Sequence, residues 1–122
     1  MKNDSAIRQK SMDFAIRIVK LKHFLQNHKE FDISGQVVRS GTAIGALVRE
    51  AEYAESKADF IHKMRIALKE ANETSYWLEL LFKTEILAED GYSSIKSDNE
   101  ELKKMLVCII NTSLKSVQFF NY

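Results

Sequence analysis

Two glycines four residues apart, Gly41 and Gly45, are the first candidates for chemistry, in the segment RSGTAIGALVREA (39–51). A phosphate-binding loop needs a preceding strand, glycines that expose backbone N–H groups, and a following Lys-Ser or Lys-Thr pair. Here Gly45 is followed by Ala46 and Leu47, and the flanking sequence has helical periodicity. The spacing therefore favours a helix whose missing side chains let another helix approach closely.

Paired carboxylates are the second candidates. Glu70 and Glu73 share one flank of a helix, one turn before Trp77. Such a pair could do acid–base work if burial separated the two pKa values. Solvated surface glutamates are the commoner case, and a third interpretation is ion pairing with Arg39 or Arg49 across a helix or subunit boundary, which would fix the packing register. No Ser, Cys or Thr is accompanied in the sequence by a convincing base, so we expect a protein that is not an enzyme and has no catalytic residue.

Metal ligands are sparse in the sequence. A di-iron bundle needs Glu-x-x-His on two helices, with a glutamate from each of the other two. Only Asp59 before His62 approximates this pattern, and His23 and His28 have no glutamate three positions earlier. The lone Cys108 lies in the apolar run LVCII, where we expect it to be buried in the core. The sequence predicts neither a metal site nor a cofactor.

Basic side chains concentrate at the start of the chain, where an anionic partner could bind. Residues 1–29 hold seven Lys or Arg and two Asp, a net charge of +5, whereas the remainder holds 11 basic and 15 acidic groups, a net charge of −4. Arg39, Arg49 and Tyr53 lie opposite the apolar seam of their helix, and such groups can hold phosphates and stack a base. The alternative is an ordinary solvated face. The candidate nucleic-acid-binding residues are Arg8, Lys10, Arg17, Lys20, Arg39, Arg49 and Tyr53.

Helices must position all of these residues, because the 122-residue chain has no proline and only four glycines. Capping boxes at SKAD (56–59) and SDNE (97–100) mark two helix starts. Apolar residues recur in steps of three and four, which is the period of helices packed lengthwise. We expect one all-α domain, an antiparallel up-and-down four-helix bundle, with helices at about 4–27, 34–55, 57–88 and 97–119.

Features outside the helix pattern bear on location and assembly. No apolar run approaches the ~20 residues that a membrane crossing needs, and the first residues lack the apolar block of a signal peptide, so we expect a cytoplasmic protein. The third helix has a wider apolar face than one bundle core needs. The segment VQFFNY (117–122) is rich in aromatic residues, and we expect Phe119 and Phe120 to pack on a neighbouring helix or subunit.

The runs KSMDFAIRIVKL (10–21) and QVVRSGTAIGALVREAEYAESKADFIHKMRIALKEANETSYWLELL (36–81) resemble a known family of four-helix bundles. The family is encoded in intervening sequences of bacterial 23S ribosomal RNA genes and is similar to the accessory variability protein of diversity-generating retroelements. The resemblance implies a small cytoplasmic bacterial protein that assembles into a barrel-like homopentamer. It also implies that a reverse transcriptase and nucleic acid are partners of the retroelement relative, which binds them through a basic surface. For most members of the family the biological role is not established.

The family pattern also implies roles for individual positions. This chain departs from it at Ala43 and Leu47, where the family commonly has Ser and Asn, and the loss of these polar groups argues against a polar ligand at the two positions. The residues expected in helix packing or at a subunit interface are Gly41, Gly45, Glu70, Glu73 and Trp77. Other positions that match the family pattern are Arg39, Ser40, Ile44, Glu50, Ala51, Ser56, Asp59, Phe60 and Ala67.

The sequence thus predicts a non-enzymatic oligomeric bundle that binds nucleic acid, with RNA favoured, as an accessory or scaffold protein. Its expected partners are further copies of itself, with a pentamer favoured, RNA or DNA, and a protein such as a reverse transcriptase. The alternative is a purely protein-binding or structural oligomer without affinity for nucleic acid.

Overall fold

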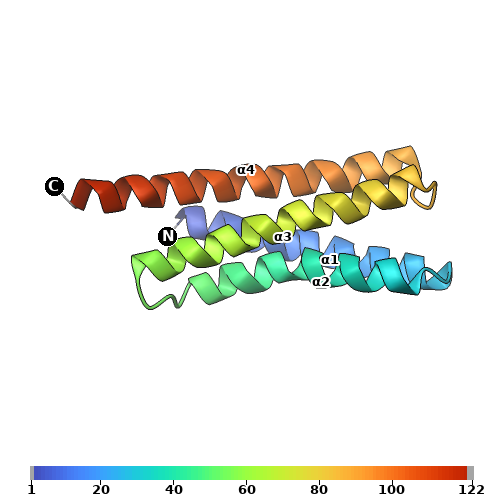
Figure 1. Ribbon diagram of the computed structural model, residues 1–122, viewed down its shortest axis with the longest axis horizontal. Coiled ribbons are helices and arrows are strands. Elements are labelled where there is room, and N and C mark those ends of the chain that lie inside the picture. The colour runs from blue at the N-terminus through green and yellow to red at the C-terminus, as the bar shows by residue number, and fades with distance from the viewer. Residues whose placement is uncertain (1, 121–122) are drawn as a thin grey trace.

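The computed structural model describes the backbone of residues 2–120 and the side chains of residues 6–116. Its four helices are α1 (Lys2–Asn27), α2 (Phe31–Ala51), α3 (Lys57–Lys83) and α4 (Glu89–Phe120). Successive helices run antiparallel, and the turns after α1 and α3 lie at the same end of the elongated molecule (Figure 1). The predicted all-α four-helix bundle is confirmed.

Local backbone chemistry sets the turn between α2 and α3. Ser56 has the extended φ of −156° and ψ of 167°, and its hydroxyl accepts a hydrogen bond of 3.0 Å from the Asp59 N–H. The Asp59 carboxylate accepts in return from the Glu55 N–H at 3.2 Å. The predicted capping box is therefore present. Helix α2 ends at Ala51 and not at the expected residue 55, so residues 52–56 form the connection to α3.

The predicted bounds of the other helices also shift. Helix α2 begins at Phe31, before the expected residue 34, and α3 ends at Lys83, before the expected residue 88. The chain reverses after α3 through Glu85, whose φ of 65° is left-handed and breaks the helical path. Lys29, with a φ of 63°, has the same role after α1.

The start predicted for the fourth helix is wrong. Helix α4 begins at Glu89 and runs without interruption through Gly91 and through residues 97–100, which were expected to form its cap. Burial of Ile95, which is only 5% exposed, extends the apolar seam upstream of Ser97. The Tyr92 ring stacks on Phe82 of α3 at a centroid distance of 4.4 Å, so tertiary packing stabilises this first part of α4.

One hydrophobic core runs along the bundle axis. All four helices contribute side chains that are at most 2% exposed, among them Phe14, Ile44, Leu78 and Leu106. Cys108, in contrast, is exposed, and the expectation of a buried thiol is wrong. Successive residues of a helix differ by 100° in direction, so the five-residue run LVCII cannot face one side. The expected packing of Phe119 and Phe120 lies outside the described side chains.

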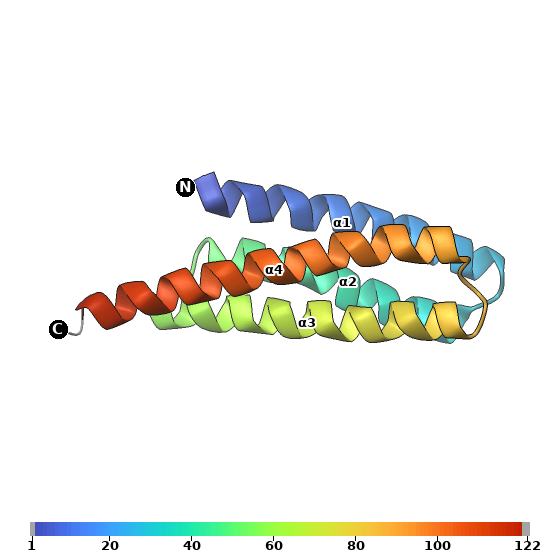
Figure 2. The same cartoon turned by 90° about the horizontal axis from the view of Figure 1, so that it is seen from above.

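Helix α4 does not follow α1 along its whole length. Side-chain pairs join the two helices at Lys10–Glu101 and Arg17–Asp98, and Figure 2 shows α1 and α4 diverging toward the N-terminal end of α1. The last turns of α4 also run past the ends of the other three helices (Figures 1 and 2). Within residues 2–120, none of the helices combines the length and the apolar composition that crossing a bilayer requires.

Candidate nucleic-acid interface

The two glycines of α2 lie against α1 of the same chain. A Cβ atom placed on Gly41 would lie 2.7 Å from Cγ1 of Ile18, and one placed on Gly45 would lie 3.4 Å from the carbonyl oxygen of Ser11. The glycines therefore allow α1 and α2 to approach closely, and Gly41 occupies the tighter position. A helix of the same chain is thus the neighbour that the missing side chains admit.

Directly outside this contact, a shallow groove of about 180 Å³ separates α1 from α2. We call it the arginine groove, because Arg8 from α1 and Arg49 from α2 both line it. Tyr53, which is 88% exposed, follows α2 in the next turn of the chain. The groove is lined by Arg8, Ser11, Met12, Ala15, Thr42, Gly45, Ala46 and Arg49.

Arg8 and Arg49 differ in their surroundings. The Arg8 guanidinium pairs with Glu52 through Nε at 2.8 Å. Among the described side chains, no carboxylate lies within ion-pair distance of Arg49, nor of the exposed Lys20 on α1. The arginine groove therefore contains one paired cation and one that is available to an external anion.

Two further candidates on α1 face α4 instead of the arginine groove. Lys10 pairs with Glu101 at 3.0 Å, and Arg17 pairs with Asp98 at 2.6 Å and donates to the Ser94 hydroxyl at 3.1 Å. The hydrogen bond from Lys10 to Glu101, together with the charge of that carboxylate, raises the pKa of the lysine. These two pairs tie α1 to α4 and neutralise part of the basic charge of α1.

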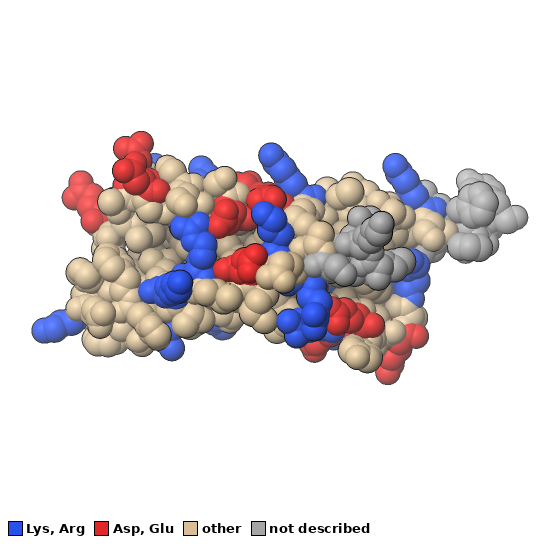
Figure 3. Space-filling view, turned by 180° about the vertical axis from the view of Figure 1, so that it is seen from behind, with Lys and Arg blue, Asp and Glu red and all other residues tan. Residues whose placement is uncertain are grey.

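The face shown in Figure 3 carries both signs of charge. Lys and Arg side chains alternate there with Asp and Glu side chains, and no continuous basic patch covers this face. Part of the net charge of +5 found in residues 1–29 is therefore paired with carboxylates of Glu52, directly after α2, and of α4.

Arg39, the remaining arginine candidate, lies between α2 and α3. Its guanidinium contacts Glu70 at 3.3 Å and also pairs with Glu73, which accepts a hydrogen bond of 3.0 Å from the Trp77 indole N–H. The candidate glutamates are thus engaged with an arginine of the neighbouring helix in the same chain, as in the third interpretation of the sequence. We call Arg39, Glu70, Glu73 and Trp77 together the Arg39 cluster. Such an arrangement fixes the register between α2 and α3.

The sequence analysis missed two buried polar contacts between helices. Thr74 donates to the Ser40 hydroxyl at 2.9 Å in the core between α2 and α3. Asn99 is fully buried, and its amide nitrogen donates to the Ala71 carbonyl at 2.9 Å and to the Ser75 hydroxyl at 2.8 Å. A signal for Asn99 was present, because it lies on the apolar seam of α4, but the segment SDNE was interpreted as a cap.

The two departures from the family pattern lie in the protein interior or at its edge. Leu47 packs against the hydrophobic core and Ala43 is half-buried. Neither position lines the arginine groove. The loss of polar groups at these positions therefore leaves the arginine groove unchanged.

Together these features define an up-and-down helical bundle in which polar pairs tie neighbouring helices and a small arginine-lined groove opens beside a close helix contact. The chain belongs to the family of 23S rRNA-intervening sequence proteins, which it matches over residues 3–108. The family that the sequence runs resembled is thus confirmed.

The chain is also similar to a solved structure, that of a protein of unknown function from the S23 ribosomal protein family of Bacteroides thetaiotaomicron. The two sequences are 55% identical, the match covers 89% of this chain and 98% of that chain, and the TM-score is 0.88. No curated protein matches this chain significantly.

Proposed function

We propose that this protein is a non-enzymatic, oligomeric accessory or scaffold protein of the bacterial cytoplasm that binds nucleic acid, with RNA as the favoured ligand. The observation that supports this proposal best is the arginine groove, in which Arg8 and Arg49 from separate helices line one surface depression. Guanidinium groups bind phosphate oxygens in two-pronged geometry, and an exposed ring such as that of Tyr53 can stack on a base.

The ion pair between Arg8 and Glu52 does not prevent phosphate binding. Both side chains are partly exposed to solvent, and surface ion pairs of this kind are worth about 0–1 kcal/mol. A phosphate of a polyanion can therefore displace Glu52 at low cost. Repetition of the groove around an oligomer would multiply a weak site into an extended basic surface.

The proposed assembly is a homopentamer, and the proposed protein partner is a reverse transcriptase or an enzyme of similar kind. Both proposals rest on the family resemblance. Light scattering at several protein concentrations tests the assembly, since a pentamer has five times the mass of the chain, and a stable monomer would contradict it. A reverse transcriptase gene beside this one, or a position inside a ribosomal RNA gene, would support the proposed context.

Titration of labelled single-stranded RNA and duplex DNA at several salt concentrations tests nucleic-acid binding directly. The double variant Arg8→Ala/Arg49→Ala should weaken binding and lower the slope of log affinity against log salt by about 1.4 for single strands, if each arginine contacts one phosphate. The matched control is Arg65→Ala/Lys69→Ala, which removes the same charge from exposed positions of α3. Equal losses in the two variants, or no binding by the natural protein at low salt, would refute the proposal.

The second candidate function is a protein-binding or structural oligomer without affinity for nucleic acid. The observation that favours it is the internal pairing of cations, because Arg8, Lys10, Arg17 and Arg39 all contact carboxylates of their own chain. An intact oligomer that binds neither RNA nor DNA at low salt would establish this alternative.

A further inference from the structure

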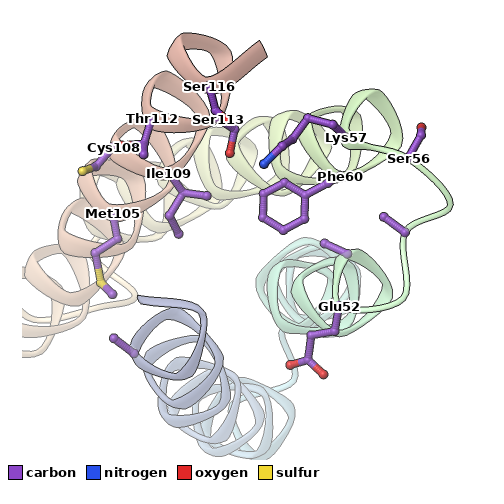
Figure 4. Close-up of a pocket in the computed structure, with 13 residues that line it drawn as sticks. Glu52, Ser56, Lys57, Phe60, Met105, Cys108, Ile109, Thr112, Ser113 and Ser116 are labelled. Carbon is purple, nitrogen blue, oxygen red and sulfur yellow. The ribbon is translucent and has the colours of Figure 1, made fainter. Parts of the chain in front are cut away.

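Two surfaces of the bundle have no role in the proposed function. One is a groove of about 670 Å³ at the end where α2 turns into α3, and all four helices contribute to its walls. Figure 4 shows Phe60 of α3 and Ile109 of α4 pointing into this space. Its walls reach Ala6 and Ser116, where the described side chains end, so the chain's own terminal segments adjoin this groove. The second surface is the outer face of α1, which the described side chains cover from residue 6 onward.

Helix α1 carries a second apolar stripe on its outer face. Met12, Ile16 and Val19 recur in steps of four and three, so they share one side of the helix, and we call them the outer stripe. Their exposed fractions are 41%, 47% and 39%. Ile16 lies two residues before the fully buried Ile18, so the two side chains point about 160° apart. A solvated helix face is normally polar, and a row of apolar side chains there indicates a contact outside the chain.

Two opposite charges flank the outer stripe on the same side. Asp13 and Lys20 are both exposed and lie seven residues apart, which places them on one flank of α1, about 10 Å apart along its axis. Among the described side chains, neither has a group of opposite charge within ion-pair distance. The midpoint between the two charges lies at residues 16–17, in the middle of the outer stripe. The flank is therefore complementary to its own copy in reversed direction.

We infer that the outer stripe packs against the outer stripe of a second copy in an antiparallel, two-fold contact. When two helices run antiparallel with their apolar stripes together, the same flank of each helix meets the same flank of the other. Asp13 of each copy then faces Lys20 of the other copy, so the pair forms twice. At the centre, Ile16 of each copy faces Val19 of the other. A parallel contact would not bring Asp13 of one copy to Lys20 of the other, so the charges select the antiparallel direction.

The neighbouring positions of α1 are compatible with this register. Met12 of each copy faces the exposed His23 of the other, so the apolar centre is bordered by a polar rim, as in other protein interfaces. On the opposite flank Ala15 faces Lys22 of the second copy, so no like charges meet there. A contact built on one helix of each copy falls at the small end of protein interfaces, and we expect it to form reversibly.

This contact goes beyond the proposed pentamer. A two-fold contact uses the same surface on both copies, so it cannot by itself close a ring of five. It joins two copies, or two rings, and doubles the mass of whatever the other surfaces assemble. The outer stripe and the other surfaces of the chain can therefore be tested separately.

Charge reversal tests the inference in the full-length protein by sedimentation equilibrium. Asp13→Lys places like charges opposite each other at both ends of the contact, and so does Lys20→Asp, so each should weaken this association about tenfold. The double variant Asp13→Lys/Lys20→Asp should restore it, because both pairs form again with exchanged signs. The matched control is Lys69→Asp, which makes the same charge change as Lys20→Asp at an exposed position of α3 and should have no effect. Circular dichroism checks that every variant is helical.

A second variant removes the apolar centre of the contact. Ile16→Lys changes an exposed position that does not line the arginine groove, and it should halve the molar mass at protein concentrations where the natural protein is fully associated. An unchanged mass in Ile16→Lys, or a double charge reversal that does not restore association, would overturn the contact and leave the proposed pentamer standing. A natural mass of five chains that does not rise with protein concentration would do the same. A natural protein that stays monomeric at high concentration would overturn both the contact and the pentamer.

Discussion

Replacement of Gly41 by alanine should destabilise the bundle, whereas the same change at Gly45 should not. The added Cβ at position 41 would lie 2.7 and 2.9 Å from the Cγ1 and Cγ2 atoms of Ile18. Carbon atoms in good contact are ~3.5–4.0 Å apart, so the overlap approaches 1 Å. Ile18 is fully buried, and both atoms branch from its Cβ, so rotation of the side chain does not remove the clash. Helix α1 must therefore move.

Two opposing effects determine the size of the change at Gly41. Overpacking of a core by one methyl group costs about 1–3 kcal/mol, and exchange of glycine for alanine inside a helix returns about 1 kcal/mol. At Gly45 the nearest atom is 3.4 Å from the new Cβ, an ordinary contact, so only the gain applies. We expect Gly41→Ala to be less stable than Gly45→Ala by about 1–3 kcal/mol in the free energy of unfolding.

Urea unfolding followed by far-ultraviolet circular dichroism measures this difference. The two variants and the natural protein are compared at one fixed protein concentration, because self-association adds to apparent stability. Unchanged slopes against urea would show that stability, and not the unfolded state, has changed. Equal unfolding free energies for the two alanine variants would refute the reasoning.

A double-mutant cycle identifies the partner of Gly41. Ile18→Ala alone should cost about 2–5 kcal/mol because it leaves a cavity. In the Gly41→Ala background it also removes the clash, so the double variant should be more stable than the sum of the single changes by about 1 kcal/mol or more. Strict additivity would show that the two positions do not touch.

Three further predictions follow from other contacts. Glu73→Ala should lower the unfolding free energy by about 1–2 kcal/mol, because the Trp77 indole N–H and the Arg39 guanidinium lose an acceptor. The control is Glu79→Ala at an exposed position of the same helix. Equal urea midpoints for the two variants would contradict the role of the Arg39 cluster. Gly91→Ala should raise stability by about 0.5–1 kcal/mol in the same assay, since its Cβ would meet nothing within 4 Å, and a loss would count against an α4 that begins upstream. The pKa of Lys10 is raised in the folded protein, so the stabilisation from its pair with Glu101 is fully present below the ordinary lysine pKa of about 10. This stabilisation is lost only as the pH rises through the higher pKa of the folded state. Lys10→Gln should therefore leave the pH dependence of the melting temperature unchanged between about pH 6 and 9.

Helical periodicity explains why much of the fold could be predicted. The seams through Phe14 and Ile44 are buried as expected, because an amphipathic helix has one way to hide its apolar stripe. The capping box at Ser56 was equally readable, since its hydrogen bonds join residues three or four positions apart. The same capping-box pattern at Ser97 led to a wrong prediction, because packing of Ile95 and Tyr92 extends α4 upstream of the helix start expected there.

The candidate site was predictable only in part. The sequence identified cationic residues as candidates for anion binding, but it could not reveal that Lys10 and Arg17 turn toward carboxylates of α4. It also could not reveal that Arg8 and Arg49 share a groove. These relations depend on the rotation and tilt of one helix against another, which residue spacing within a single helix does not specify.

The amino-acid sequence alone determined the number of helices, their apolar faces and the family, because these depend on local periodicity and on short motifs. Only the tertiary structure decided that Gly41 and Gly45 admit α1 of their own chain, that Glu70 and Glu73 hold Arg39, and that a groove opens where α4 leaves α1. The physical reason is that contacts between helices depend on interaxial distance and relative rotation. Both arise from the packing of all side chains together, and no segment encodes them by itself.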